Sequence, residues 1–160
     1  MEIAGSPESH PSEMTLITYR QPIYFDDLDA LQMLHNARYA VYVERATTAF
    51  YESLGKVWEQ DVADNPDQFH VVREIHVEFL APFKRTGELR VGLWLEQLGA
   101  TSCTYGFRCT SGVADVVHAH GRRTIVRLDP GSLRPAPWTD WFRTAHVRLA
   151  HSDRGESGLA

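Results

Sequence analysis

Hydrophobic side chains recur along one stretch of the chain at intervals of three and four residues. The positions concerned are Ala40, Val43, Ala46, Ala49 and Phe50. This spacing is the period of an amphipathic helix. Gly55 follows directly, and glycine commonly stands just past the end of a helix. The pattern therefore predicts one long helix from Asn36 to about Leu54.

Most of the remaining chain alternates apolar and polar residues with the period of two that is typical of strands. The predicted strands are 15–25, 71–79, 89–95, 102–109 and 113–128. Short connections with turn residues such as Gly87 and Gly112 favour an antiparallel sheet. A single long helix must bury its apolar face on that sheet. The fold class predicted is α+β, with one long helix wrapped by a curved antiparallel sheet of about five strands, and with a short final helix or turn after Pro135.

Domain boundaries follow from composition. The 160 residues are enough for one domain, residues 14–148. Residues 1–13 are rich in Ser, Pro and Glu and are expected to be disordered, and residues 149–160 are expected to form a flexible tail. No apolar run approaches the roughly 20 residues of a membrane span. The first residues lack the basic start and apolar core of a signal peptide, so we expect a cytoplasmic protein without membrane contact.

Net charge and cysteine spacing argue against nucleic-acid binding, a disulfide and a zinc site. A net charge of −5 argues against a nucleic-acid partner. Cys103 and Cys109 lie six residues apart in one predicted strand, and we interpret both as reduced thiols. No cysteine pair has the spacing of a zinc site, and no metal is predicted. His118 and His120 would share a strand face as a metal pair might, but without a third ligand a partly exposed strand is the better interpretation.

The candidate chemistry lies between the first strand and the helix. Asp26, Asp27 and Asp29 come just before the predicted helix start at Asn36. Backbone N–H groups at a helix N-terminus are unpaired and carry partial positive charge. A carboxylate beside such donors is suited to attack a carbonyl and to hold the oxyanion that results. From residue type alone, a role in a turn or as a helix cap is the favoured interpretation of Asp29.

Three blocks in order carry a resemblance to a known family. They are Phe25–Asp29 with Asn36–Tyr39 and Glu44–Ala46, then Val77–Pro82 with Gly87–Leu89, and then Leu98–Ser102. This arrangement resembles the hotdog fold, and within it the acyl-CoA thioesterases similar to 4-hydroxybenzoyl-CoA thioesterase. The resemblance covers roughly residues 17–142.

The resemblance implies an activity and a set of site residues. Asp29 falls on the family's catalytic aspartate, acting as nucleophile or as general base toward water. The backbone N–H near Asn36 falls where the thioester oxygen binds. Thr101 and Ser102 are expected to contact the substrate. The implied substrate is an acyl-CoA or another acyl thioester, with no cofactor beyond the coenzyme A of the substrate. A homodimer with sheets joined edge to edge is also implied, with a tetramer of paired dimers as the larger assembly.

Several side chains near this site keep two interpretations. His35 is a donor to the oxyanion or substrate, or a neighbour of the helix cap. Tyr39 lines an acyl pocket, or belongs to the core as aromatics at helical spacing commonly do. Glu44 is a rival catalytic base, although a structural ion pair is favoured. Asp27 is expected to be structural.

Gln32 departs from the family pattern, which has glycine at this position. Glycine permits a positive φ at little cost, whereas glutamine does not. Either the turn is built differently, or Gln32 bears strain of about 1 kcal/mol. Gln32 is expected to contact the substrate. Its departure from glycine bears on the acyl pocket and is the best support for a protein that binds acyl thioesters without turnover.

The class of reaction and the identity of the thiol carrier both stay open. A hotdog hydratase or dehydratase is the second enzyme class, although Asp29 and His35 lack the Asn-Pro motif common in such enzymes. Coenzyme A and acyl-carrier protein both remain as the thiol carrier. Positive side chains for phosphate groups are supplied by Lys84, Arg85, Arg122 and Arg123.

Overall fold

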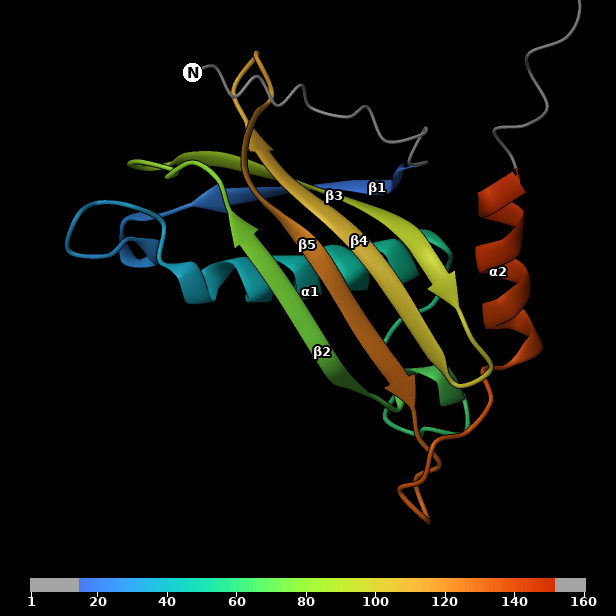
Figure 1. Cartoon of the computed structure of the whole chain (residues 1–160). Coiled ribbons are helices and arrows are strands. Elements are labelled where there is room, and N and C mark those ends of the chain that lie inside the picture. The colour runs from blue at the N-terminus through green and yellow to red at the C-terminus, as the bar shows by residue number, and fades with distance from the viewer. Residues whose placement is uncertain (1–14, 152–160) are drawn as a thin grey trace, which may run out of the picture.

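A computed structural model describes residues 15–151 of the chain (Figure 1). The strands are β1 (Thr15–Ile23), β2 (His70–Phe79), β3 (Gly87–Leu98), β4 (Ser102–Ser111) and β5 (Val116–Arg127), and the helices are α1 (Asn36–Ser53) and α2 (Asp140–His151). Two short 3-10 helices, Phe25–Asp27 and Pro66–Gln68, flank α1 in the sequence. The predicted disordered segment 1–13 and most of the predicted tail lie outside the described residues.

The five strands form one antiparallel sheet in the order β1-β3-β4-β5-β2. The sheet curves, and α1 lies along one of its faces (Figure 1). The predicted α+β class, with one main helix on a five-stranded sheet, is confirmed. No helix within residues 15–151 is long and apolar enough to cross a membrane.

Helix α1 begins and ends where the hydrophobic pattern predicts. His35 caps its N-terminus by accepting a hydrogen bond from the N–H of Ala37. Gly55 adopts a φ of 78° just past the C-cap, a conformation that glycine reaches without a steric penalty. One face of the helix is buried against the sheet and consists of Tyr39, Tyr42, Val43, Ala46, Thr47 and Phe50.

The core between α1 and the sheet is formed by alternating residues of the central strands. Leu89, Val91 and Leu93 of β3 are fully buried, and so are Phe107 and Cys109 of β4. Burying each large apolar side chain contributes about 1.5–3 kcal/mol. Both cysteines are free thiols, as predicted, and burial raises the pKa of each to about 12.

Strand β2 lies at the edge of the sheet, and its apolar side chains are more exposed than their alternation predicts. The sequence predicts one apolar face from Val71 to Phe79. A register shift between Val72 and Glu74 interrupts the alternation, so that Val77 packs on the core and Phe79 packs edge-on against Tyr39. Val71, Val72, Ile75 and Phe79 are between 38 and 52% exposed. The free edge of the sheet therefore carries apolar side chains that the described residues cover only in part.

Helix α2 starts five residues after Pro135 and runs to His151, which takes it into the predicted tail. A chain of hydrogen bonds attaches it to the core. The hydroxyl groups of Tyr51 and Tyr105 lie 2.9 Å apart, and that of Tyr105 lies 2.7 Å from Nε2 of His146. Nδ1 of His146 donates to the carbonyl of Phe142, so Nε2 is left to accept from Tyr105.

Candidate active site

An open groove of about 480 Å³ lies at the N-terminal end of α1. One side is formed by the loop that leads into the helix and by the first turn of the helix. The other side is formed by the end of β2 and the residues that follow it. The lining residues are Asp29, Met33, Leu34, His35, Asn36, Tyr39, Phe79, Leu80, Ala81 and Pro82. Four residues predicted from the sequence, Asp29, His35, Asn36 and Tyr39, therefore meet here.

Asp27 organises the loop and does not line the groove. Its buried carboxylate accepts a hydrogen bond from the N–H of Tyr24 and lies 3.3 Å from the guanidinium of Arg38. Its backbone carbonyl accepts from the N–H of His35 at 3.0 Å. These bonds hold the start of α1 against the loop, so the structural role expected for Asp27 is confirmed.

Asp29 uses its two carboxylate oxygens differently. Oδ1 accepts hydrogen bonds from the N–H groups of Leu31 at 2.8 Å and Met33 at 3.0 Å. Oδ2 makes no hydrogen bond with another described residue, and the side chain lines the groove. Asp29 is thus a turn residue through one oxygen and carries an unpaired, charged oxygen beside the groove.

The start of α1 supplies donors to the same groove. Nδ1 of His35 accepts from the N–H of Ala37 at 3.2 Å, so in the neutral ring the proton lies on Nε2. The N–H of Asn36 makes no hydrogen bond with another described residue. It is the first free donor of a helix whose N-terminus carries about half a positive charge.

The loop keeps the backbone geometry that glycine would favour at Gln32. This residue has a φ of 58°, which settles the alternative left open by the sequence: the left-handed turn is present and glutamine adopts it. The carbonyl of Gln32 accepts a hydrogen bond at 3.0 Å from Arg85, whose φ is also left-handed at 68°. Two strained residues therefore hold each other in place beside the groove. Gln32 itself does not line the groove.

The opposite side of the groove is apolar, and a buried histidine, His118, holds its backbone in place. Phe79 packs edge-on against Tyr39 with ring centroids 5.3 Å apart, and burial raises the pKa of Tyr39 to about 12. His118 is buried, whereas the sequence suggested partial exposure. Its Nδ1 lies 3.1 Å from the carbonyl of Ala81, and its Nε2 lies 2.6 Å from the hydroxyl of Ser111. His118 thereby fixes the residues that form this side.

Thr101 and Ser102 lie elsewhere in the chain. Thr101 lies in the turn between β3 and β4 and Ser102 is the first residue of β4, whereas the groove lies near the turn at the other end of β3. The 12 residues of β3 separate these two turns by about 35 Å. Glu44 does not line the groove either. Its carboxylate lies 3.7 Å from the guanidinium of the buried Arg123, which agrees with the structural ion pair favoured above.

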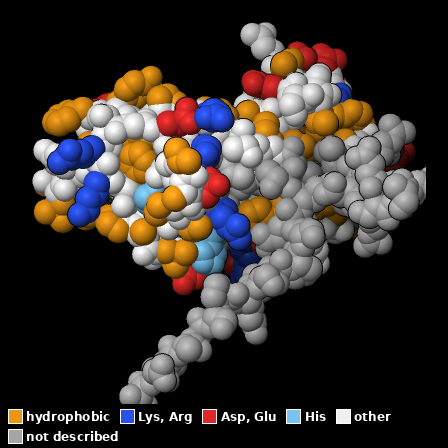
Figure 2. Space-filling model, turned by 90° about the horizontal axis from the view of Figure 1, so that it is seen from above, with side chains coloured by type: hydrophobic (Ala, Val, Ile, Leu, Met, Phe, Trp, Pro, Cys, Tyr) orange, Lys and Arg blue, Asp and Glu red, His pale blue; other side chains and the backbone are white. Residues whose placement is uncertain are grey.

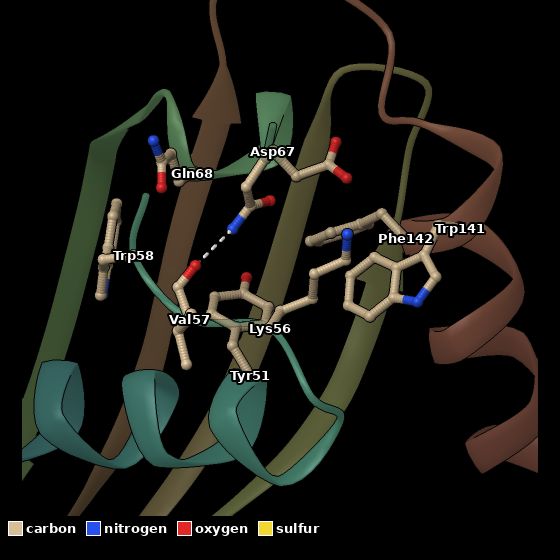
Figure 3. Close-up of a pocket in the computed structure, with 9 residues that line it drawn as sticks. Tyr51, Lys56, Val57, Trp58, Asp67, Gln68, Trp141 and Phe142 are labelled. Carbon is tan, nitrogen blue, oxygen red and sulfur yellow. Dashed lines mark hydrogen bonds between the residues drawn. The ribbon is translucent and has the colours of Figure 1, made fainter. Parts of the chain in front are cut away.

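A second pocket lies near the C-terminal end of α1 (Figure 3). Its walls include Tyr51, Trp58, Trp141 and Phe142. The ammonium group of Lys56 lies 4.8 Å from the ring centre of Trp141 and fills much of the space between the aromatic side chains. With a volume of about 20 Å³ the pocket holds little more than a water molecule. It is therefore too small for a thioester.

Comparison with known families identifies the class of protein. The profile of the Thioesterase-like superfamily matches residues 23–146. The chain belongs to this superfamily. No curated protein sequence matches the chain.

Solved structures share the fold. A thioesterase from Thermus thermophilus, complexed with coenzyme A and Zn, is 25% identical with a TM-score of 0.70, over 86% of this chain and 97% of that one. A 1,4-dihydroxy-2-naphthoyl-CoA thioesterase from Synechocystis is 19% identical with a TM-score of 0.74, over 84% and 97%. A putative thioesterase from Pseudomonas aeruginosa is 24% identical with a TM-score of 0.68, over 82% and 98%. The fold is the hotdog fold predicted from the sequence blocks.

Sequence reasoning missed the apolar side of the groove and the histidine beneath it. Phe79, Leu80, Ala81 and Pro82 belong to a block that carried the resemblance, but we assigned them no role. The signal was present, because an apolar strand that runs into a proline marks a strand end with exposed side chains. The role of His118 had no such signal, since it depends on the pairing of β5 with β2.

Proposed function

We propose that the protein is an acyl-CoA thioesterase, which hydrolyses a thioester to a free carboxylic acid and coenzyme A. One observation carries this proposal. The unpaired Oδ2 of Asp29 and the unpaired N–H of Asn36 belong to residues that line the same groove. Membership of the Thioesterase-like superfamily supports the reaction class. Fold relatives described as acting on or binding CoA compounds support the substrate class.

In this mechanism the thioester oxygen accepts a hydrogen bond from the N–H of Asn36, where the helix dipole favours the developing negative charge. Asp29 then acts in one of two ways. It attacks the carbonyl carbon and expels the thiolate, leaving a mixed anhydride that water cleaves, or it takes a proton from a water molecule that attacks. Nε2–H of His35 supplies a further donor, and Tyr39 and Phe79 receive the acyl group.

The working form is proposed to be a homodimer joined along β2. The exposed apolar side chains of this edge strand support that arrangement. An uncovered strand edge also presents unpaired backbone groups to a second strand. In one chain, Thr101 and Ser102 are far from the groove, so their proposed contacts with the substrate require a second subunit.

No observation favours a second function. The hydratase alternative has no further support, because no Asn-Pro motif lies between Asp29 and His35. Binding without turnover drew its support from Gln32, and Gln32 adopts the backbone conformation that glycine would take.

Release of free thiol from short, long and aromatic acyl-CoAs tests the proposal, with hydration of an enoyl-CoA measured in parallel. We expect thiol release from at least one class of ester and no hydration. Hydration without thiol release would overturn the proposal in favour of the second enzyme class. Tight binding of acyl-CoA without either reaction would overturn it in favour of a binding protein.

A further inference from the structure

The β2–β3 turn carries two adjacent positive side chains. Lys84 and Arg85 are exposed, and neither side chain makes a hydrogen bond or ion pair with another described residue. Nearby arginines differ in this respect, since Arg20 pairs with Glu88 and Arg38 pairs with Asp27. In a chain of net charge −5, two adjacent unpaired cations are a distinct local feature.

Backbone hydrogen bonds fix this turn to the loop that carries Asp29 and leads into α1. The N–H of Leu34 donates to the carbonyl of Phe83 at 2.9 Å, and Met33 pairs with Lys84 in an isolated bridge. Arg85 donates to Gln32 as described above. Met33 and Leu34 both line the groove. The two cations are therefore attached to the rim of the groove through the same loop that carries Asp29.

The distance from the groove is short. Arg85 follows Pro82, which lines the groove, by three residues, so their backbones lie within about 10 Å of each other. Lys84 and Arg85 both have long side chains that can reach across the mouth. Lys and Arg side chains lie among hydrophobic ones at the end of the molecule where α1 begins and the β2–β3 turn lies (Figure 2).

The backbone of Arg85 is left-handed, and this conformation also favours a functional role. A non-glycine residue at positive φ costs on the order of 1 kcal/mol, and such residues cluster at functional sites. The bond to Gln32 maintains that conformation. The guanidinium is thus carried on a fixed segment of backbone, and less ordering is needed when it binds an anion.

We infer that Lys84 and Arg85 bind phosphate at the end of the pantetheine arm of the thioester substrate. The inference rests on the proposed function, because the thioester must lie in the groove. Arginine binds phosphate through paired N–H donors, and lysine binds it as a compact point charge. The other cations suggested by the sequence are placed differently: Arg122 pairs with Glu74, and Arg123 is buried beside Thr47.

The test compares the double variant Lys84→Gln/Arg85→Gln with the wild type. Substrates are the best CoA ester of the panel and the N-acetylcysteamine ester of the same acid, which has no phosphate. We expect KM for the CoA ester to rise roughly tenfold or more, since hydrogen bonds to charged groups are strong, with kcat little changed. KM for the N-acetylcysteamine ester should not change. An unchanged KM for the CoA ester, or an equal rise for both esters, would overturn the inference.

Arg134→Gln is the matched control. Arg134 is exposed, lies between β5 and α2, and its side chain has no partner among the described residues. The substitution removes one positive charge, as each of the two substitutions in the double variant does, but far along the chain from the β2–β3 turn. KM for the CoA ester should therefore stay at the wild-type value. A rise equal to that of the double variant would show a general effect of charge and would contradict a local site.

A third substrate separates the two sources of phosphate. The 4′-phosphopantetheine ester of the same acid carries only the phosphate that a carrier protein also presents. A KM rise on this ester places the bound phosphate next to the pantetheine arm, which both carriers share. A rise on the CoA ester alone assigns the site to the nucleotide end of coenzyme A. Either result supports the inference.

Calorimetry with free coenzyme A keeps the test independent of catalysis. If no ester is hydrolysed, weaker binding of coenzyme A by the double variant than by the wild type would support the phosphate site while the proposed function fails. Equal binding, or no binding by either protein, would overturn the inference itself.

Discussion

At the scale of single residues, one oxygen of Asp29 has a structural role in its own loop, and the other is the one for which we propose a chemical role. Oδ1 is committed to two backbone N–H groups of its own loop, and Oδ2 is free beside the groove. The bonds to Oδ1 fix the position of the carboxylate before a substrate arrives. Fixing a reacting group in advance lowers the entropic cost of the reaction.

Substitution of Gln32 tests the strain inferred in this loop. Gln32→Gly should leave the free energy of unfolding equal to that of the wild type or raise it by up to about 1 kcal/mol, because glycine adopts a φ of 58° without penalty. Gln32→Val should lower it by about 1–2 kcal/mol, since β-branched side chains tolerate this region poorly. Urea denaturation measures both. A clear loss of stability in the glycine variant would contradict the assigned backbone.

At the scale of elements, the sequence-based prediction was most accurate where residues within one helix or strand determine its structure. Helix α1 was correct at both ends because its apolar period, its N-terminal residues and Gly55 all agree. Strand β2 was placed correctly, but its edge position depends on how distant strands pair, which local alternation does not encode. In the site, the chain segment with Asp29, His35 and Asn36 was predictable from contiguous residues, whereas His118 beneath Ala81 was not.

His118 should act as a positioning residue for the apolar side of the groove. His118→Phe keeps a ring against Phe83 but removes the hydrogen bond to Ala81. We expect the free energy of unfolding to fall by about 1–3 kcal/mol and KM to rise several-fold. Ser111→Ala is the control, because it removes only the bond between Ser111 and His118. If both variants have the wild-type KM, His118 does not position the groove.

Helix α2 should make stability dependent on pH through His146. Burial lowers the pKa of this residue below its usual 6.5, so the unfolded chain binds more protons than the folded protein as the pH falls below that value. Stability should be full above about pH 6.5 and should decline below it, by at most about 1.4 kcal/mol per pH unit from this group. Denaturation between pH 5 and 8 measures the slope.

The variant His146→Phe should have a shallower slope than the wild type. A residual slope is expected from His70, whose pKa burial also lowers. Identical slopes in the wild type and the His146 variant would show that this side chain does not titrate with unfolding.

At the scale of the whole molecule, the exposed edge of β2 should determine assembly. Val72→Lys places a charge at a position that is 46% exposed, and charged residues on an edge oppose strand pairing. We expect the mass in solution to fall from that of two chains to that of one, 18.2 kDa, and activity to fall with it. Val113→Lys, at a fully exposed valine of the β4–β5 turn, should leave the dimer intact. A monomeric wild-type protein with full activity would contradict the assembly.

The most direct test of the catalytic role proposed for Asp29 is the value of kcat for Asp29→Asn on the best thioester substrate. Asparagine keeps an oxygen that can accept the bonds from Leu31 and Met33, so the loop should stay folded while the carboxylate is lost. We expect kcat to fall by about 10²- to 10⁴-fold, with the thermal unfolding temperature unchanged. A folded variant with the kcat of the wild type would mean that Asp29 is only a turn residue and that the chemistry lies elsewhere.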